Sequence, residues 1–184
     1  MEVALQAHLF AGFARAINAL ATIHRVGVLE GSVPDVTMTS SSDDVPCDAT
    51  PHDWRLDLHS DDAWRTEGQE ACAQIYGKGY DKLRKRMSDM HPVLDSMMIE
   101  NGYGRVMSRP GLSLRLRELC VLAILAGQDV APQLNSHIRG AMRVGATHEE
   151  VEAVLQQTGL AWGEEAHLQA MATFETLQSA RYGL

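Results

Sequence analysis

The chain has 184 residues and a formal net charge of −8, and 45% of its residues are hydrophobic. This length suits a single domain, and the ordinary hydrophobic share excludes wholesale disorder. The 24 acidic residues outnumber the 16 basic ones, which argues against a nucleic-acid binder, because such proteins carry a basic face. No apolar run is long enough to span a membrane, and Glu2 stands where a secretory signal would carry positive charge. We therefore expect a cytoplasmic protein with neither a nucleic-acid nor a membrane partner.

Helix-favouring residues dominate the chain, and no strand-like alternation runs beyond a few residues, so we predict an all-α fold. A first helical region covers residues 2–24. Residues 27–60 then lose the helical period and gather serine, proline and aspartate, which predicts an acidic loop or arm. The domain prediction is therefore an N-terminal helical segment packing on the core at 1–26, an acidic arm at 27–60 and a helical domain at 61–184.

Local capping signals divide the rest of the chain into helices. Pro92 and Pro132 suit first turns, Ser113 suits an N-cap, and Thr147 with Glu150 forms a capping box. The remaining helices are expected at 61–76, 81–90, 92 to 102 or 104, 113–126, 132–145, 147–159 and 164–180.

One internal similarity links the two ends of the chain. Five residues between positions 3 and 19 recur 151 positions later, and Gly12 corresponds to Gly163. The similarity indicates either a repeated helix–glycine–helix unit or chance matches between helices rich in Ala and Leu.

Two ionisable residues stand on otherwise apolar helix faces. Glu118 shares its face with four apolar residues, and His137 is the only ionisable group on its face of the following helix. A short break between the helices predicts an antiparallel hairpin, in which the two residues lie at similar heights and face one pocket. Such a pair suits acid–base chemistry. The alternatives are a Glu118 satisfied by Arg109, Arg115 or another helix end, and a core histidine bonded to a backbone carbonyl.

The cysteines at positions 47, 72 and 120 form no C-x-x-C pair, and their odd number argues against a disulfide framework. The histidines and aspartates of the acidic arm are candidate metal ligands, but their spacing matches no known metal-binding motif. We therefore expect a solvated loop and predict no metal. The candidate ligands are His52, Asp53, Asp57, His59, Asp61 and Asp62.

The stretch from Arg117-Glu118-Leu119 through Gln133-Leu134-x-x-His137 and Gly145-Ala146-Thr147 resembles the carboxymuconolactone decarboxylase-like family. That family includes the alkylhydroperoxidase D-type proteins. The resemblance covers about residues 85–180 and implies an alkylhydroperoxidase D-like helical bundle. The N-terminal helices resemble the unit that normally ends this domain, which suggests a permuted fold or one with an N-terminal helical extension.

The resemblance implies one of two chemistries. The peroxidase branch carries a C-x-x-C pair where this chain has Val130 and Gln133, which supply no thiolate. The other branch is a lyase that decarboxylates a small carboxylated lactone without metal or organic cofactor, as in aromatic catabolism. By resemblance His137 is its general acid/base and Glu118 the partner. The residues expected to bind substrate are Gln133, Arg117, Arg109, Tyr103 and Trp162.

Two other functions remain open at this point. One is an alkylhydroperoxidase-like antioxidant activity that uses cysteines rebuilt into a redox pair, and the other is a non-catalytic helical oligomerisation module. The resemblance also implies a homo-oligomer, as a trimer or hexamer, with a small molecule as its other partner.

Overall fold

The computed structural model describes residues 2–30, 61–128 and 130–182, and within these residues it contains helices and no strand. The prediction of an all-α fold is confirmed. The helices are α1 (Glu2–Gln6), α2 (His8–Ala11), α3 (Phe13–Leu29), α4 (Asp61–Tyr76), η2 (Gly77–Gly79), α5 (Tyr80–Met90), α6 (Pro92–Met97), η3 (Met98–Met107), α7 (Leu114–Leu125), α8 (Ala131–Arg143), α9 (His148–Trp162) and α10 (Glu164–Tyr182).

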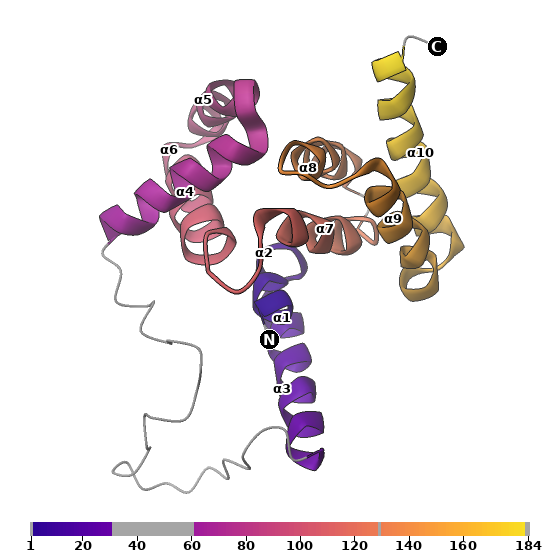
Figure 1. Ribbon diagram of the computed structural model, residues 1–184. Helices are drawn as coiled ribbons and strands as arrows, with labels where there is room; N and C mark the ends of the chain where they lie inside the picture. The colour runs from indigo at the N-terminus through magenta and orange to yellow at the C-terminus, as the bar shows by residue number, and fades with distance from the viewer. Residues whose placement is uncertain (1, 31–60, 129, 183–184) are drawn as a thin grey trace, which may run out of the picture.

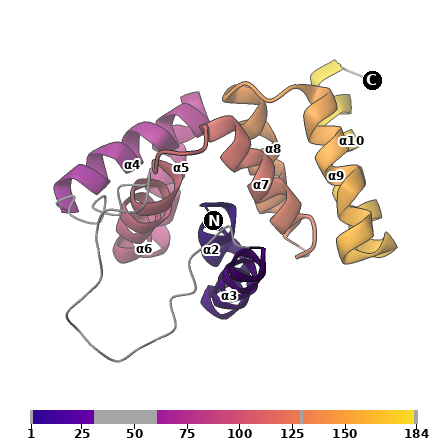
Figure 2. The same ribbon diagram turned by 60° about the horizontal axis from the view of Figure 1, so that its bottom comes forward.

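Helices α7 and α8 form the centre of the molecule (Figure 1). The group α4–α6 lies on one side of this pair, and α9 with α10 lies on the other, as a turned view also shows (Figure 2). The apolar faces of these helices meet in one core, because each helix must bury its apolar stripe against a neighbour. The α7–α8 pair is therefore held in place from two sides.

The predicted capping signals are confirmed at three helix ends. The Ser113 hydroxyl accepts a hydrogen bond from the Leu116 backbone N–H at the start of α7. Thr147 and Glu150 exchange the two hydrogen bonds of a capping box at the start of α9. Gly145 follows α8 with a φ of +101°, a backbone conformation that suits glycine.

The predicted helix end at Gly102 or Gly104 is wrong, because η3 continues to Met107 as a π-helix. Gly104 serves close packing instead. A Cβ on Gly104 would lie 2.1 Å from the Trp64 carbonyl oxygen of α4, and a Cβ on Gly68 of α4 would lie equally close to the Ile99 carbonyl oxygen of η3. Glycine therefore lets two backbones approach where the sequence pattern predicted a stop.

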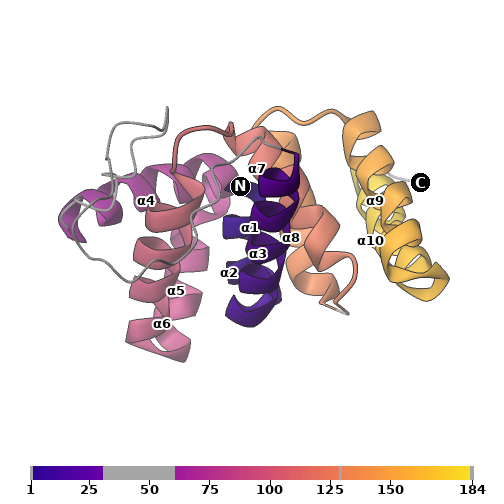
Figure 3. The ribbon, with the colours of Figure 1, turned by 90° about the horizontal axis from the view of Figure 1, so that it is seen from below.

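The N-terminal helical region is three helices, and α3 continues to Leu29. Residues 27–29, expected in the acidic arm, therefore belong to a helix, and residues 31–60 lie outside the described part of the chain. Helices α1 and α2 contact α7, and α1 also contacts η3. Helix α3 packs on α1 and α2. It runs away from α7 in Figure 1 and lies in front of α7 and α8 when the molecule is seen from below (Figure 3).

The two glycines of the internal similarity share one backbone conformation. Gly12 has φ and ψ of 89° and 156°, and Gly163 has 90° and 172°. Each N–H donates to the carbonyl four residues earlier, and each carbonyl accepts from the residue four positions later. Gly163 also corrects the predicted end of α9 at 159, because the helix continues to Trp162. The helix–glycine–helix unit thus recurs in local geometry as well as in sequence.

Candidate functional site

A cavity of about 520 Å³ lies between α2, α4, α5, α6, η3 and α8. This volume is in the range of sites that take a small organic molecule. Its polar lining comes from α4, η3 and α8 and from Arg86 of α5, and most of its apolar lining comes from α2 and α5 together with η3. The other polar residues are Tyr76, Tyr103, Gln133, Ser136 and His137. The deeper apolar ones are Leu9, Phe10, Leu83, Met87, Met98 and Met107.

His137 of α8 and Glu118 of α7 meet at the wall of this cavity. His137 Nδ1 lies 2.9 Å from Glu118 Oε2, at hydrogen-bonding distance. Glu118 is fully buried behind the ring, whereas His137 is 7% exposed and lines the cavity. The hairpin of α7 and α8 therefore brings together Glu118 and His137, the two ionisable residues that the sequence pattern places on apolar helix faces.

The contact with Glu118 decides which ring nitrogen of His137 serves a ligand. A carboxylate accepts hydrogen bonds only, so we assign the Nδ1 proton to the bond with Glu118. Nε2 is then the nitrogen available on the cavity side. Phe10 and Tyr76 both stand edge-on to the imidazole, with centroids 5.6 and 6.4 Å away, and restrict its rotation. The ring is thus held by one polar and two aromatic neighbours.

Gly140 makes room for the Glu118 carboxylate. A Cβ at this position would lie 3.0 Å from Glu118 Oε2 and 2.7 Å from Cγ2 of Ile75. The other carboxylate oxygen, Oε1, is buried and has no hydrogen-bond partner among the described residues. A buried carboxylate with one unpartnered oxygen is costly, and such costs are typical of functional sites.

Tyr76 and Tyr103 place two phenol groups in the cavity wall beside His137. Their hydroxyl groups hydrogen-bond one another, and their rings meet edge-on with centroids 6.2 Å apart. Burial raises the pKa of Tyr76 to about 12 and raises the pKa of Tyr103 well above its usual range. Both hydroxyl groups therefore keep their protons at neutral pH, and because one of them donates to the other, one hydroxyl proton of the pair is left for a hydrogen bond to a ligand oxygen.

The described cysteines lie in surroundings that disfavour thiolate. Burial raises the pKa of the Cys72 thiol to about 12, and it also raises that of Cys120. Both are free thiols, and the protonated form is a poor nucleophile. Cys47 lies outside the described residues.

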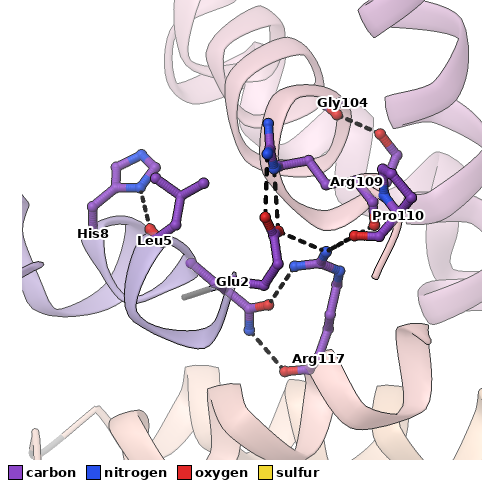
Figure 4. A network of polar contacts seen from close by, with 9 residues as sticks. Glu2, Leu5, His8, Gly104, Arg109, Pro110 and Arg117 are labelled. Carbon is purple, nitrogen blue, oxygen red and sulfur yellow. Dashed lines mark hydrogen bonds and ion pairs between the residues drawn. The ribbon is translucent and has the colours of Figure 1, made fainter. Parts of the chain in front are cut away.

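Arg117 and Arg109, expected to bind substrate, face Glu2 instead of the cavity (Figure 4). Arg117 is fully buried and donates to the carboxylate of Glu2, to Oε1 of Gln6 and to the backbone carbonyls of Arg109 and Pro110. Arg109 donates two bonds to the same Glu2 carboxylate. These two arginines therefore attach α1 to the turn before α7.

Of the other three expected binding residues, two line the cavity and one does not. Gln133 and Tyr103 line the cavity. Trp162 does not, because its indole Nε1 donates to the Ala123 carbonyl and its ring covers Gly127 at the far end of α7. Sequence reasoning missed Tyr76, which lies in the last turn of α4, and Arg86 of α5, which is the only lysine or arginine among the described residues of the lining. A basic run around Arg86 was the available signal.

Within the described residues, no three His, Cys, Asp or Glu side chains gather in a way that could hold a metal ion. Four of the residues considered above as metal ligands, His52, Asp53, Asp57 and His59, lie outside the described part of the chain. A search of the same described residues finds no helix long and apolar enough to cross a membrane.

The sequence model of the Carboxymuconolactone decarboxylase family matches residues 97–176. This range contains both Glu118 and His137, as well as all of η3, α7, α8 and α9. The match therefore covers the wall of the cavity that carries the buried Glu–His pair.

Three curated proteins illustrate the similarity. "Peroxisomal protein 2" of Schizosaccharomyces pombe is 32% identical over 105 residues, which are 56% of this chain and 49% of that protein. The chain thus spans about half the length of this relative. "Nitrosuccinic acid decarboxylase npaB" of Metarhizium robertsii is 31% identical over 57% of this chain and 74% of its own length. "4-carboxymuconolactone decarboxylase" of Acinetobacter baylyi is 26% identical over 57% of this chain and 79% of its own length.

Proposed function

Because the chain belongs to the carboxymuconolactone decarboxylase family, we propose that it is a cofactor-independent carboxy-lyase. Its substrate is a carboxylated lactone or a related acid. The observation that carries this proposal is the 2.9 Å contact between His137 Nδ1 and Glu118 Oε2 at the cavity wall. Two relatives are named as decarboxylases, of nitrosuccinic acid and of 4-carboxymuconolactone, and their names support the same reaction class.

The proposed reaction begins with loss of CO₂ from the bound carboxylate. The electron pair of the broken C–C bond moves into a neighbouring unsaturated group and leaves an enolate or its equivalent. A carboxylate in an apolar cavity loses its hydration, which favours release of neutral CO₂. The hydrogen-bonded pair of protonated hydroxyl groups on Tyr76 and Tyr103 is placed to donate one hydrogen bond to the oxygen that gains charge.

Protonation of carbon completes the reaction. In this proposal His137 enters as the imidazolium, and Nε2 gives its proton to the carbanion. The neutral ring keeps the proton on Nδ1, where it is hydrogen-bonded to Glu118. Solvent returns one proton to Nε2 for the next turnover. The net reaction consumes one proton and releases one CO₂. Glu118 acts as a positioning residue that stabilises the charged ring.

The test compares CO₂ release from nitrosuccinic acid, 4-carboxymuconolactone and other unsaturated or β-substituted carboxylic acids. We expect His137→Ala to lower kcat/KM by at least about 100-fold, the usual contribution of a general acid, with unchanged circular dichroism. His24→Ala, on α3 and away from the cavity, is the matched control. Full turnover in H137A, or no CO₂ release from the whole panel, would contradict the proposal.

The same experiment separates the two alternatives. An alkylhydroperoxidase-like activity predicts that hydroperoxide consumes free thiols, whereas the raised pKa of Cys72 opposes it. A non-catalytic module predicts neither CO₂ release nor thiol loss.

Because the S. pombe relative is named as a peroxisomal protein, a fluorescent fusion of this chain should be imaged to distinguish the predicted cytoplasmic location from a peroxisomal one.

A further inference from the structure

The wall of the cavity opposite the polar residues is unusually apolar for a site that takes a small polar acid. Helix α2 contributes only Leu9 and Phe10, and α5 contributes Leu83 and two methionines beside Arg86. A compact, highly charged acid would lose hydration of its polar groups against these side chains without forming hydrogen bonds to replace it. An apolar portion of a ligand would instead gain free energy there in proportion to the area it buries.

The charges in the lining point to a ligand with a single anionic group. Among the residues that the structure describes, Arg86 is the only lysine or arginine that lines the cavity, and no aspartate or glutamate lines it. One carboxylate has a permanent positive charge available, whereas a second or third would be desolvated without a partner.

The open side of the cavity is also apolar. Met90 and Leu94 line the cavity and remain 55% and 41% exposed. Exposed methionines adapt their shape to flexible apolar ligands. A chain that starts beside His137 can therefore continue toward solvent along the end of α5 and the start of α6 without leaving apolar surface.

We propose that the substrate of this cavity is a carboxylic acid with one charged group and an extended apolar chain, an inference that rests on the proposed function for the reacting end. The apolar chain occupies the wall formed by α2, α5 and η3 and passes Met90 and Leu94. The acid is thus larger and more apolar than a compact polycarboxylate.

Binding by calorimetry tests this inference without any turnover. The probes are butanoate, hexanoate and octanoate below micelle-forming concentration, with citrate as the compact polyanion. We expect one site per chain and an affinity that rises about three- to fourfold with each added methylene, as apolar burial requires. A flat series, or tighter binding of citrate than of octanoate, would overturn the inference.

Two exposed methionines supply a matched pair of variants. Met90 lines the cavity and is 55% exposed, whereas Met97 of α6 is 54% exposed and does not line it. We expect Met90→Asp to weaken octanoate binding about tenfold and Met97→Asp to leave it unchanged. Equal effects of the two variants would overturn the inference. A lower molar mass of M90D by light scattering, with unchanged octanoate affinity, would identify the rim as a contact between copies and would overturn it too.

Arg86 and His137 complete the design. Arg86→Gln should weaken octanoate binding and leave the binding of octan-1-ol unchanged, because only the acid is charged. Loss of both ligands, or of neither, would contradict the role of Arg86. The chain-length series is repeated in His137→Ala. If affinity rises with chain length but turnover does not need His137, only the proposed function is overturned. If affinity does not change with chain length but decarboxylation needs His137, only this inference is overturned.

Discussion

Arg117 shows how the neighbours of a single residue decide its role. Its guanidinium group is fully buried, and the carboxylate that balances its charge is Glu2, 115 positions earlier in the chain. Burial lowers the pKa of Arg117, and the contact with Glu2 acts in the opposite direction. A buried charge that keeps its partner is tolerated, whereas removal of one partner is strongly destabilising. The pair therefore makes α1 part of the folded core.

The pKa of Glu2 predicts how this pair depends on pH. Burial by itself raises that pKa, but hydrogen bonds and charges from Arg109 and Arg117 outweigh burial, and the net direction is downward from 4.5. A carboxyl group with a lowered pKa in the folded state adds stability above its unfolded value, and this stability is lost as the pH falls through the folded value. The contribution should therefore be complete near pH 7 and decline as the pH falls below 4.5 toward the lowered pKa of the folded state.

Glu2→Gln removes the charge and should lower the free energy of unfolding at pH 7 by about 1–3 kcal/mol, the range for a hydrogen bond to a charged group. Urea titrations of both proteins at pH 7 and pH 3 measure the difference, which should shrink at pH 3. Glu175→Gln, on the exposed face of α10, is the control and should change neither value. If the free energies of unfolding of wild type and E2Q differ by the same amount at both pH values, the charge of Glu2 is not the cause of the difference.

At the scale of elements, the contact between α4 and η3 depends on two glycines. Gly68 faces the Ile99 carbonyl and Gly104 faces the Trp64 carbonyl, each too close for a Cβ. This contact holds Tyr103 in the cavity wall and orients Tyr76 at the end of α4. Close helix packing therefore positions the two phenol groups.

Gly104→Ala should destabilise the protein by about 1–3 kcal/mol, because overpacking against backbone atoms forces the helices apart. Thermal unfolding followed by circular dichroism measures the loss. Gly102→Ala, in the same helix, is the matched control, since a Cβ there meets no atom within 4 Å and should leave stability unchanged or raise it slightly. A G104A protein as stable as G102A would disprove the packing argument.

The same scale explains why Glu118 meets His137. Helices α7 and α8 are joined by a short connection and pack together, and similar distances from that connection bring the two side chains to one height. Gly140 then leaves the space that the Glu118 carboxylate needs. Helical periodicity and a short turn are local properties, and this is why the pairing could be anticipated.

At the scale of the whole molecule, α3 leaves apolar side chains exposed among the described residues. It packs on α1 and α2, and Ile23 and Val26, one turn apart, remain 41% and 43% exposed. Exposed apolar faces of this kind are typical of contacts between proteins. We propose that the face carrying Ile23 and Val26 joins copies of this chain, in keeping with the homo-oligomer that the family resemblance implies.

Light scattering after size exclusion should therefore give wild type the mass of two or more chains. The double variant Ile23→Asp/Val26→Asp should shift the mass toward one chain, with helical content retained. Leu168→Asp, an exposed apolar position on α10, is the comparison and should keep the wild-type mass. A monomeric wild type would contradict the proposal.

Periodicity and capping within a few turns predicted the helices, most of their caps and a common pocket for Glu118 and His137, because these are local properties of the chain. The sequence by itself could not separate a glycine that ends a helix, as expected at 104, from one that admits a neighbouring backbone. Only the tertiary structure showed that Arg117 and Arg109 bind Glu2 while Arg86 lines the cavity. An arginine has the same local signal in both places, and the partner that decides its role lies on a helix distant in sequence.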